Sequence, residues 1–293
     1  MKITLKRFDI RQIPKDGRII LVIGRRGSGK STLMKDLMFH MRERFDFGVG
    51  MSPTRASVDM LCTHLPPALV YEEGFSPEQF QKMVALCQLL SRKKKLRKGL
   101  LVLDDCNADK GAFRTVTMRN CFMNGRHYNI NLLWSMHYCL DLTTDLRTQI
   151  DYVIVLKESI RKNKERLWNN FFGMFPKFED FDRVMSACTQ NHEALVLDNT
   201  VVEPSVESCL YWYKAQVNIP QFTIGKQVYF KLSRYYQSEE KENDDDDMLK
   251  VTIRRPGAPP RPPLAGKIVI PAMVAADPSN PRVELVEKSH HDQ

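Results

Sequence analysis

One stretch decides the fold of this chain of 293 residues: Gly24-Arg25-Arg26-Gly27-Ser28-Gly29-Lys30-Ser31. It follows an apolar run at residues 19–23 and precedes a helical pattern at residues 32–44. A strand, a glycine-rich loop and a helix in this order, with the spacing G-x-x-x-x-G-K-S/T, are typical of a phosphate-binding P-loop. The stretch therefore predicts a nucleotide site, and a glycine-rich structural turn is the alternative.

The residue types in this loop suit a nucleoside triphosphate. Glycines let successive backbone N–H groups face one anion, and the N-terminus of the following helix adds partial positive charge. Lys30 is expected to reach the β- and γ-phosphates of ATP, and the Ser31 hydroxyl to ligate Mg²⁺. Arg25 and Arg26 either add charge at the nucleotide or face a neighbouring subunit. The predicted nucleotide-binding residues are Gly24, Arg25, Arg26, Gly27, Ser28, Gly29, Lys30, Ser31 and Thr32.

Two acids, Asp104 and Asp105, directly follow a continuous apolar run at residues 100–103. Such a run is expected for a central parallel strand, and the carboxyl ends of parallel strands converge on the ligand crevice. We therefore expect Asp104 to hold Mg²⁺, directly or through water, and Asp105 to orient or deprotonate the attacking water. A solvated turn after a strand is the alternative. A second acid favours hydrolysis, and hence an ATPase, over a small-molecule kinase.

The choice of ATP rests on the lack of a guanine-reading motif. Residues 107–110 have the letters of the N-K-x-D motif but in the wrong order, and no D-x-x-G follows a strand. The sequence offers no positive adenine-binding motif. ATP with Mg²⁺ is therefore the expected nucleotide and cofactor pair.

The composition is that of an ordinary soluble protein, with 43% hydrophobic and 27% charged residues. No run approaches the roughly 20 apolar residues of a membrane helix, so no transmembrane segment is expected. The N-terminus also lacks the apolar core of a signal peptide. Seven cysteines are scattered without a C-x-x-C pair, which indicates reduced, buried thiols rather than a metal site.

Charge is distributed unevenly along the chain. From residue 239 onward there are 8 Lys/Arg and 11 Asp/Glu, a net charge of −3. The whole chain has a net charge of +9, so the first 238 residues have a net charge of +12. A basic body predicts a polyanionic partner, most simply nucleic acid, and solubility alone is the alternative. Six of the seven residues at 92–98 are basic, which indicates backbone contact with DNA, a helix C-terminal cap or a localisation signal.

Strands alternate with helices along residues 1–238, which predicts an α/β fold: a P-loop NTPase core with a mostly parallel central sheet flanked by helices. Residues 1–238 are the predicted ATPase domain. Residues 239–293 are acidic and then proline-rich, with 8 of the 16 prolines, and are predicted to be a disordered tail that docks other proteins through its polyproline stretch or only solvates the chain. Strands are expected at residues 45–51, 100–103, 130–136, 152–156, 194–197 and, at a sheet edge, 209–213. Helices are expected from residue 76, at 110–123, 159–172 and 179–188.

A further motif, Asn124-Gly125-Arg126-His127, precedes the predicted strand at residues 130–136, which ends at His137. Together with the glycine loop and Asp104-Asp105, this ordered set resembles the DNA-packaging ATPases of poxviruses and other large nucleocytoplasmic DNA viruses. Those proteins belong to the FtsK–HerA superfamily of P-loop motors. The resemblance covers roughly residues 15–215 and includes residues 146–153, 171–175 and 194–200.

The resemblance implies a homo-oligomeric ring that hydrolyses ATP to push double-stranded DNA into a preformed capsid. Its expected partners are capsid or portal-region proteins, and its expected location is the virion or the viral assembly site of the infected cell. In that superfamily a polar residue, usually Gln, senses the γ-phosphate, and His137 stands at this position. A neighbour's arginine often completes such a site, with Arg126 as first candidate and Arg147 as second. The predicted catalytic residues are Lys30, Asp105, Arg126 and His137.

Structural roles are the alternatives for these residues, as a strand-end histidine and as surface arginines paired with carboxylates. Two other functions also stay open from the sequence. One is a cellular or mobile-element DNA translocase of the same superfamily. The other is a scaffold that binds ATP and DNA without hydrolysis. Ring size, direction of movement, host, capsid partner and any nuclease partner are not encoded in a readable motif.

Overall fold

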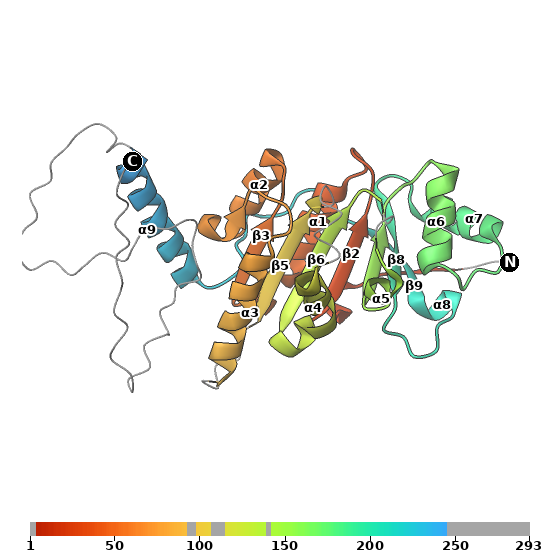
Figure 1. Cartoon of the computed structure of the whole chain (residues 1–293). Helices are drawn as coiled ribbons and strands as arrows, with labels where there is room; N and C mark the ends of the chain where they lie inside the picture. Colours follow the sequence, from red (N-terminus) through yellow and green to blue (C-terminus); the bar gives the residue numbers. More distant parts are fainter. Residues whose placement is uncertain (1–3, 93–97, 107–114, 139–141, 245–293) are drawn as a thin grey trace, which may run out of the picture.

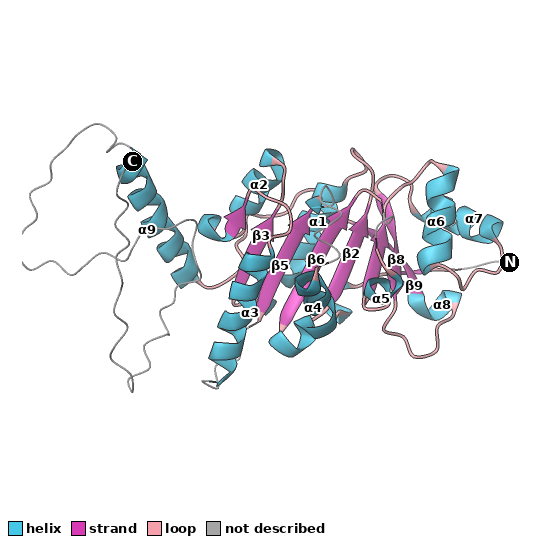
Figure 2. Cartoon of the chain, in the orientation of Figure 1, coloured by secondary structure: helices cyan, strands magenta, loops and turns pink. Residues whose placement is uncertain are grey.

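A computed structural model describes residues 4–92, 98–106, 115–138 and 142–244 of the chain. Within these residues, nine strands form one sheet in the order β1-β9-β8-β7-β2-β6-β5-β3-β4. Helices cover both faces of this sheet; Figure 1 shows α3 and α4 in front of it and α1 behind, and Figure 2 shows the same arrangement by element type. The predicted α/β architecture is confirmed.

The predicted strands and helices lie within a few residues of their expected bounds, although residues 110–114 of the helix expected at 110–123 lie outside the described residues. The strands are β1 Lys6–Arg7, β2 Ile19–Ile23, β3 Phe47–Met51, β4 Val70–Tyr71, β5 Gly99–Asp104, β6 Ile130–Met136, β7 Tyr152–Val155, β8 Glu193–Asp198 and β9 Leu210–Lys214. The α-helices are α1 Lys30–Met41, α2 Arg55–Cys62, α3 Pro77–Arg92, α4 Val116–Asn124, α5 Thr144–Arg147, α6 Arg161–Phe171, α7 Phe178–Cys188, α8 Val206–Cys209 and α9 Gln227–Asp244. Short 3₁₀ helices include η1 Ile10–Gln12, η2 Arg42–Arg44, η3 Pro67–Leu69 and η6 Gly125–Tyr128. Of these elements, β4, α2, α5, α8 and α9 were not predicted.

The sheet is mostly parallel, as predicted. Strands β7, β2, β6, β5, β3 and β4 run parallel to one another, and β1 runs parallel to β9. Strand β8 is antiparallel to both of its neighbours, β7 and β9. The start of β8 therefore lies at the same edge as the carboxyl ends of the central parallel strands. This reversal brings His192, the residue before β8, to that edge.

Burial on both faces explains why the central strands are apolar throughout. All five residues of β2 are buried, and successive residues point to opposite faces of the sheet. Ile19, Leu21 and Ile23 pack in one cluster with residues of α3, α4, α6 and α7. Ile20 and Val22 pack in a second cluster with α1 and α2. The two clusters fix β2, and with it the loop that follows, between two layers of helices.

Helix α3 begins where the sequence predicts. The Gln79 N–H donates to Ser76 Oγ at 3.4 Å, and Pro77 occupies the first helical position. Its Phe80, Met83 and Cys87 side chains are buried, as their helical spacing predicts. The basic run that follows α3 lies mostly outside the described residues, at 93–97.

Two expectations about element position differ from the structure. Strand β9 is not an edge strand, because the two residues of β1 pair with its Tyr211 and Trp212. Helix α9 ends at Asp244, so residues 239–244, which were expected to start the tail, are helical. Glu and Lys are good helix formers, which explains the extension past residue 238. Residues 245–293, with the proline-rich segment, lie outside the described residues.

Two further predictions concern the cysteine thiols and membrane-spanning segments. Cys87, Cys106 and Cys121 are buried and unpaired, and burial raises the pKa of the Cys87 and Cys106 thiols to about 12, so both stay protonated near neutral pH. In the part of the chain that the structure describes, none of the helices has both the length and the apolarity needed to cross a membrane.

Candidate functional site

The P-loop lies between β2 and α1, at the carboxyl edge of the parallel strands. The Gly24 N–H donates to the Met136 carbonyl at 3.1 Å, and a Cβ on Gly24 would lie 2.6 Å from Ser28 Oγ. Gly29 has a φ of +96° and caps α1 without a side-chain hydrogen bond. The first N–H groups of α1 are thus available to another acceptor. At Gly24 the loop has no room for a side chain. This local geometry suits a phosphate group.

The predicted catalytic residues Lys30, Asp105 and His137 meet at this loop. Lys30 Nζ forms an ion pair with Asp105 Oδ1 and lies 3.5 Å from His137 Nδ1. His137 Nε2 lies 3.1 Å from Asp105 Oδ2, and His137 Nδ1 lies 3.2 Å from the Gly24 carbonyl oxygen. The three side chains come from α1, from the end of β5 and from the residue after β6. The prediction that these strand ends converge on the P-loop is confirmed by these contacts.

The backbone of Asp105 explains how its side chain reaches Lys30. Asp105 has a φ of +52°, a left-handed conformation that is uncommon for a residue other than glycine. The chain thus leaves the extended geometry of β5 immediately after Asp104, and Asp105 does not continue the alternation of the strand. The carboxylate is 20% exposed, against 7% for the Lys30 side chain. The acid is therefore the more accessible partner of this ion pair.

Asp104 is held by a residue that the sequence analysis missed. Ser135 pairs with Asp104 in the register of β5 and β6, and its hydroxyl donates to Asp104 Oδ1. The Asp105 N–H donates in turn to Ser135 Oγ at 3.3 Å. Asp104 is 2% exposed and Ser135 is fully buried. A single serine inside the apolar strand at residues 130–136 was the available signal, since a hydroxyl in such a strand needs a partner.

The two predicted Mg²⁺ ligands fit a magnesium site of the kind found in nucleotide enzymes. Mg²⁺ commonly takes one or two protein oxygen ligands and completes its shell with water and substrate phosphates. Ser31 is exposed in the first turn of α1, and Asp104 ends β5 on the side of the P-loop where Lys30 meets Asp105. Among the described residues there is no group of three His, Cys, Asp or Glu side chains that would hold a metal by itself. The donor set therefore fits a magnesium ion brought with a nucleotide.

The remaining predicted loop residues differ in exposure. Ser28 is buried and its hydroxyl donates to the Arg25 carbonyl at 2.7 Å, which closes the loop. Arg25 and Arg26 are exposed at the tip of the loop, and Thr32 is half-buried. The two arginines are thus accessible both to a nucleotide and to a neighbouring molecule, and their role stays open.

Arg126 and Arg147 lie at the opposite edge of the sheet from the P-loop. Arg126 belongs to η6, which precedes β6, and Arg147 belongs to α5, which precedes β7. Arg126 Nη2 lies 3.5 Å from Asp151 Oδ1, and the Arg126 side chain is 60% exposed. Arg147 donates to Asn170 Oδ1 and to Thr144 Oγ1. Neither arginine reaches Lys30 of its own chain, so a catalytic role for either requires a neighbouring subunit.

A second missed residue, His192, contacts the P-loop from the other side. Its Nδ1 lies 3.4 Å from the Ser28 carbonyl oxygen, and a Cβ on Gly29 would lie 3.3 Å from the same nitrogen. His192 directly precedes β8, the antiparallel strand, which brings it to the carboxyl edge of the sheet. No motif or spacing in the sequence connects His192 with residues 24–31.

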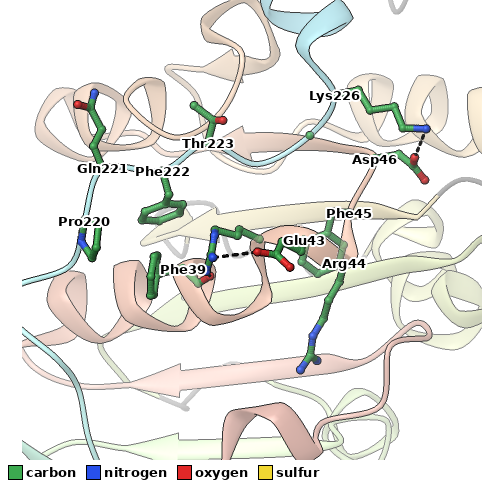
Figure 3. Close-up of a pocket in the computed structure, with 12 residues that line it drawn as sticks. Phe39, Glu43, Arg44, Phe45, Asp46, Pro220, Gln221, Phe222, Thr223 and Lys226 are labelled. Carbon is green, nitrogen blue, oxygen red and sulfur yellow. Dashed lines mark hydrogen bonds and ion pairs between the residues drawn. The ribbon is translucent and has the colours of Figure 1, made fainter.

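A wide groove of about 760 Å³ lies elsewhere, at the C-terminal end of α1 (Figure 3). Phe39 and Phe222 face each other across it with ring centroids 5.4 Å apart, and Lys226 pairs with Asp46 at 2.6 Å. The P-loop begins at the other end of α1. This groove is therefore separate from the phosphate site.

The fold and the site together define the chain as a P-loop NTPase. No family model matches it. The chain is 30% identical over 254 residues to uncharacterized protein L437 of Acanthamoeba polyphaga mimivirus, a match that covers 83% of this chain and 87% of the relative. It is 28% identical over 247 residues to uncharacterized protein 075L of Invertebrate iridescent virus 6, covering 80% and 95%. The chain belongs to the protein family that includes L437 of the mimivirus.

Two solved structures share its fold. One is the genome packaging NTPase B204 from Sulfolobus turreted icosahedral virus 2 in complex with ATP-gammaS, with a TM-score of 0.50, 16% identity, and 69% of this chain and 99% of that chain covered. The other is B204, the DNA-packaging ATPase from Sulfolobus Turreted Icosahedral Virus, with a TM-score of 0.50, 17% identity, and 69% and 98% covered. At these identities the likeness concerns the fold. The predicted resemblance is confirmed: the relatives are proteins of large DNA viruses, and the fold is that of viral genome-packaging NTPases.

Proposed function

We propose that this protein is an ATP-driven motor that moves double-stranded DNA into a viral capsid. The contact of Lys30 with Asp105 and His137 at a P-loop is the observation that carries the proposal. It unites a phosphate-binding lysine, an acid able to activate water and a polar strand-end residue at one edge of the sheet. The viral origin of the relatives, and the packaging function named for the two B204 structures, support the DNA substrate.

Hydrolysis follows from what each side chain can do. Backbone N–H groups of the loop and Lys30 neutralise the phosphates. Ser31 and Asp104 would hold Mg²⁺, which would offset the charge that develops on the β- and γ-phosphates. Asp105 takes a proton from water as the water oxygen bonds to the γ-phosphorus. The bond from the γ-phosphorus to the bridging oxygen breaks, and ADP leaves with phosphate. His137 can donate a hydrogen bond to the γ-phosphate while it lies beside the P-loop backbone.

The Lys30–Asp105 ion pair gives this mechanism an order of events. A γ-phosphate carries more negative charge than a carboxylate and competes for the same ammonium group. When Lys30 turns to the phosphate, Asp105 loses its charge partner and is available to water. The Asp105 carboxylate, which takes the proton from water, is thus released by the bound nucleotide, and this limits the activation of water when no nucleotide is bound.

The proposed motor acts as a homo-oligomeric ring on DNA. The basic body, with a net charge of +12 before residue 239, suits non-specific contact with the DNA backbone, and residues 92–98 are the densest basic run. Arg126 is the proposed trans-acting arginine, because it lies exposed at the edge away from its own site. Capsid or portal-region proteins are the proposed docking partners, and the viral assembly site or virion is the proposed location.

ATP hydrolysis with and without long double-stranded DNA tests the proposal. We expect turnover that rises with DNA and is lost in Lys30→Ala and in Asp105→Asn. The exposed Lys177→Ala and Glu203→Gln variants remove the same charges away from the site and serve as matched controls. Nucleotide binding without turnover under any condition would contradict the motor and favour a scaffold.

A further inference from the structure

The turn before β8 has an unusual backbone. The Glu193 N–H donates to the Gln190 carbonyl at 2.8 Å, and the two residues between them, Asn191 and His192, have φ values of +51° and +62°. Positive φ at both central residues is the pattern of a type I′ turn, in which glycine is strongly preferred at the second central position. A bulky side chain there costs conformational free energy, and such costs concentrate at ligand sites. Histidine and asparagine adopt this conformation more readily than most residues other than glycine, but glycine would adopt it at a lower cost.

The ring of His192 is held against the P-loop. The Ser28 carbonyl oxygen only accepts hydrogen bonds, so Nδ1 of His192, 3.4 Å away, is the donor in this contact. The residue is exposed, although this one edge packs over Ser28 and Gly29. One edge of the ring is thus anchored while the rest of it faces solvent beside the start of α1.

The proposed mechanism puts the γ-phosphate on the other side of the loop from His192. In the sheet order β8-β7-β2-β6-β5, the P-loop follows β2, and Asp105 and His137 follow β5 and β6. In the proposed mechanism Asp105 acts on the attacking water and His137 on the γ-phosphate, which places the γ-phosphate on their side of the loop. The nucleoside of a triphosphate so oriented extends away from them. His192 enters from the opposite side, where β7 and β8 lie.

We propose that His192 is a stacking contact for the purine base of the bound nucleoside triphosphate. The inference rests on the proposed nucleotide site and adds the part of the site that recognises the nucleoside. An aromatic ring presents its face to a base, and stacking of this kind tolerates either purine. The contact explains why a strained position carries an aromatic side chain where glycine would fit at lower cost.

Comparing the affinities for two ligands distinguishes the contribution of the base from that of the phosphates. Calorimetry would measure the affinities of the purified full chain for Mg²⁺ with ATP bearing a β,γ-methylene bridge, and for Mg²⁺ with inorganic tripolyphosphate. His192→Gly suits the positive φ and removes the ring, His192→Asn also suits the conformation without a ring, and His192→Phe keeps an aromatic face. Asn129→Gly, at a φ of +56° near the opposite edge of the sheet, is the matched backbone control.

The expected result is selective. His192→Gly and His192→Asn should bind the ATP analogue about tenfold more weakly, which corresponds to the stacking of one base, and tripolyphosphate as the native chain does. His192→Phe and Asn129→Gly should stay within about twofold of the native chain for both ligands. An equal loss for both ligands in His192→Gly, or no loss for either, would overturn the base contact. Failure of the native chain to bind either ligand would instead overturn the nucleotide site itself, and the inference with it.

Discussion

Lys30 and Asp105, 75 positions apart in the chain, form an ion pair at the P-loop. Lys30 is the residue expected to bind the β- and γ-phosphates, and Asp105 is the residue expected to act on water. The pair therefore links phosphate binding to the availability of the acid. Asp105 adopts a left-handed backbone directly after β5, and its carboxylate meets Lys30 at the start of α1.

Asp105→Asn tests the two roles of the acid separately. We expect turnover to fall by about two to four orders of magnitude, because the amide cannot take the proton of water. Affinity for ATP should be unchanged or higher, because the amide competes less for the Lys30 ammonium. Steady-state hydrolysis and calorimetric binding measure the two effects. An equal loss of binding and turnover would show that Asp105 is needed only to shape the loop.

Ser135→Ala removes the hydroxyl that holds Asp104. We expect the Mg²⁺ concentration for half-maximal hydrolysis to rise several-fold, because the carboxylate loses its fixed orientation, as is usual for residues that support a metal ligand. The free energy of unfolding should fall by roughly 1–3 kcal/mol, because a buried carboxylate oxygen loses its donor. A Mg²⁺ titration of activity and urea unfolding measure these changes, with the exposed Ser186→Ala as control. An unchanged Mg²⁺ dependence would contradict the assignment of Asp104.

Tyr213→Phe probes a buried charge that ties β9 to α1. The Tyr213 hydroxyl donates to Asp36, which is fully buried, and His40 Nε2 lies 3.4 Å from the other carboxylate oxygen. Burial raises the pKa of Asp36 above its ordinary value of 3.8, partly opposed by the Tyr213 hydrogen bond. The variant should lose roughly 1–3 kcal/mol of stability at neutral pH.

The pH dependence of this loss has a definite sign. A carboxyl whose pKa is raised in the folded state binds more protons there than in the unfolded state, so its cost is absent below pH 3.8 and grows as pH rises through the folded-state pKa. Without the Tyr213 hydroxyl the charged form of Asp36 is less favoured still. The loss of stability in Tyr213→Phe should therefore become smaller at acidic pH, where Asp36 is protonated. Urea unfolding across a pH series measures it. A loss that is equal at all pH values would indicate a packing effect.

Arg126→Ala tests action between subunits. We expect hydrolysis to fall at least about a hundredfold with little change in ATP affinity, since an arginine acting in trans stabilises the transition state. Mixing Arg126→Ala with Lys30→Ala should restore part of the activity, because a mixed ring contains some interfaces with both residues intact. The pair of Arg126 with Asp151 also contributes to the fold, so thermal unfolding is the control. No recovery on mixing would contradict the trans role.

Much of the fold was predictable because its signals are local. The apolar run at β6 matches its strand residue for residue, and Ser76 with Pro77 predicted the start of α3. The prediction that β9 is an edge strand was wrong because β1, a strand of only two residues, pairs with it. The start of the tail was expected at residue 239 because a run of like charges begins there, whereas helix α9, which was not predicted, continues through Asp244.

The sequence by itself determined the P-loop, the acids after β5 and the histidine after β6, because each is a short motif beside a strand whose apolar pattern is readable. Only the tertiary structure decided that Ser135 holds Asp104 and that His192 contacts Ser28. Both contacts depend on strand order and direction: the register of β5 with β6 aligns the first pair, and the reversal of β8 creates the second. Order and direction arise from packing between segments far apart in the chain, which no local pattern encodes.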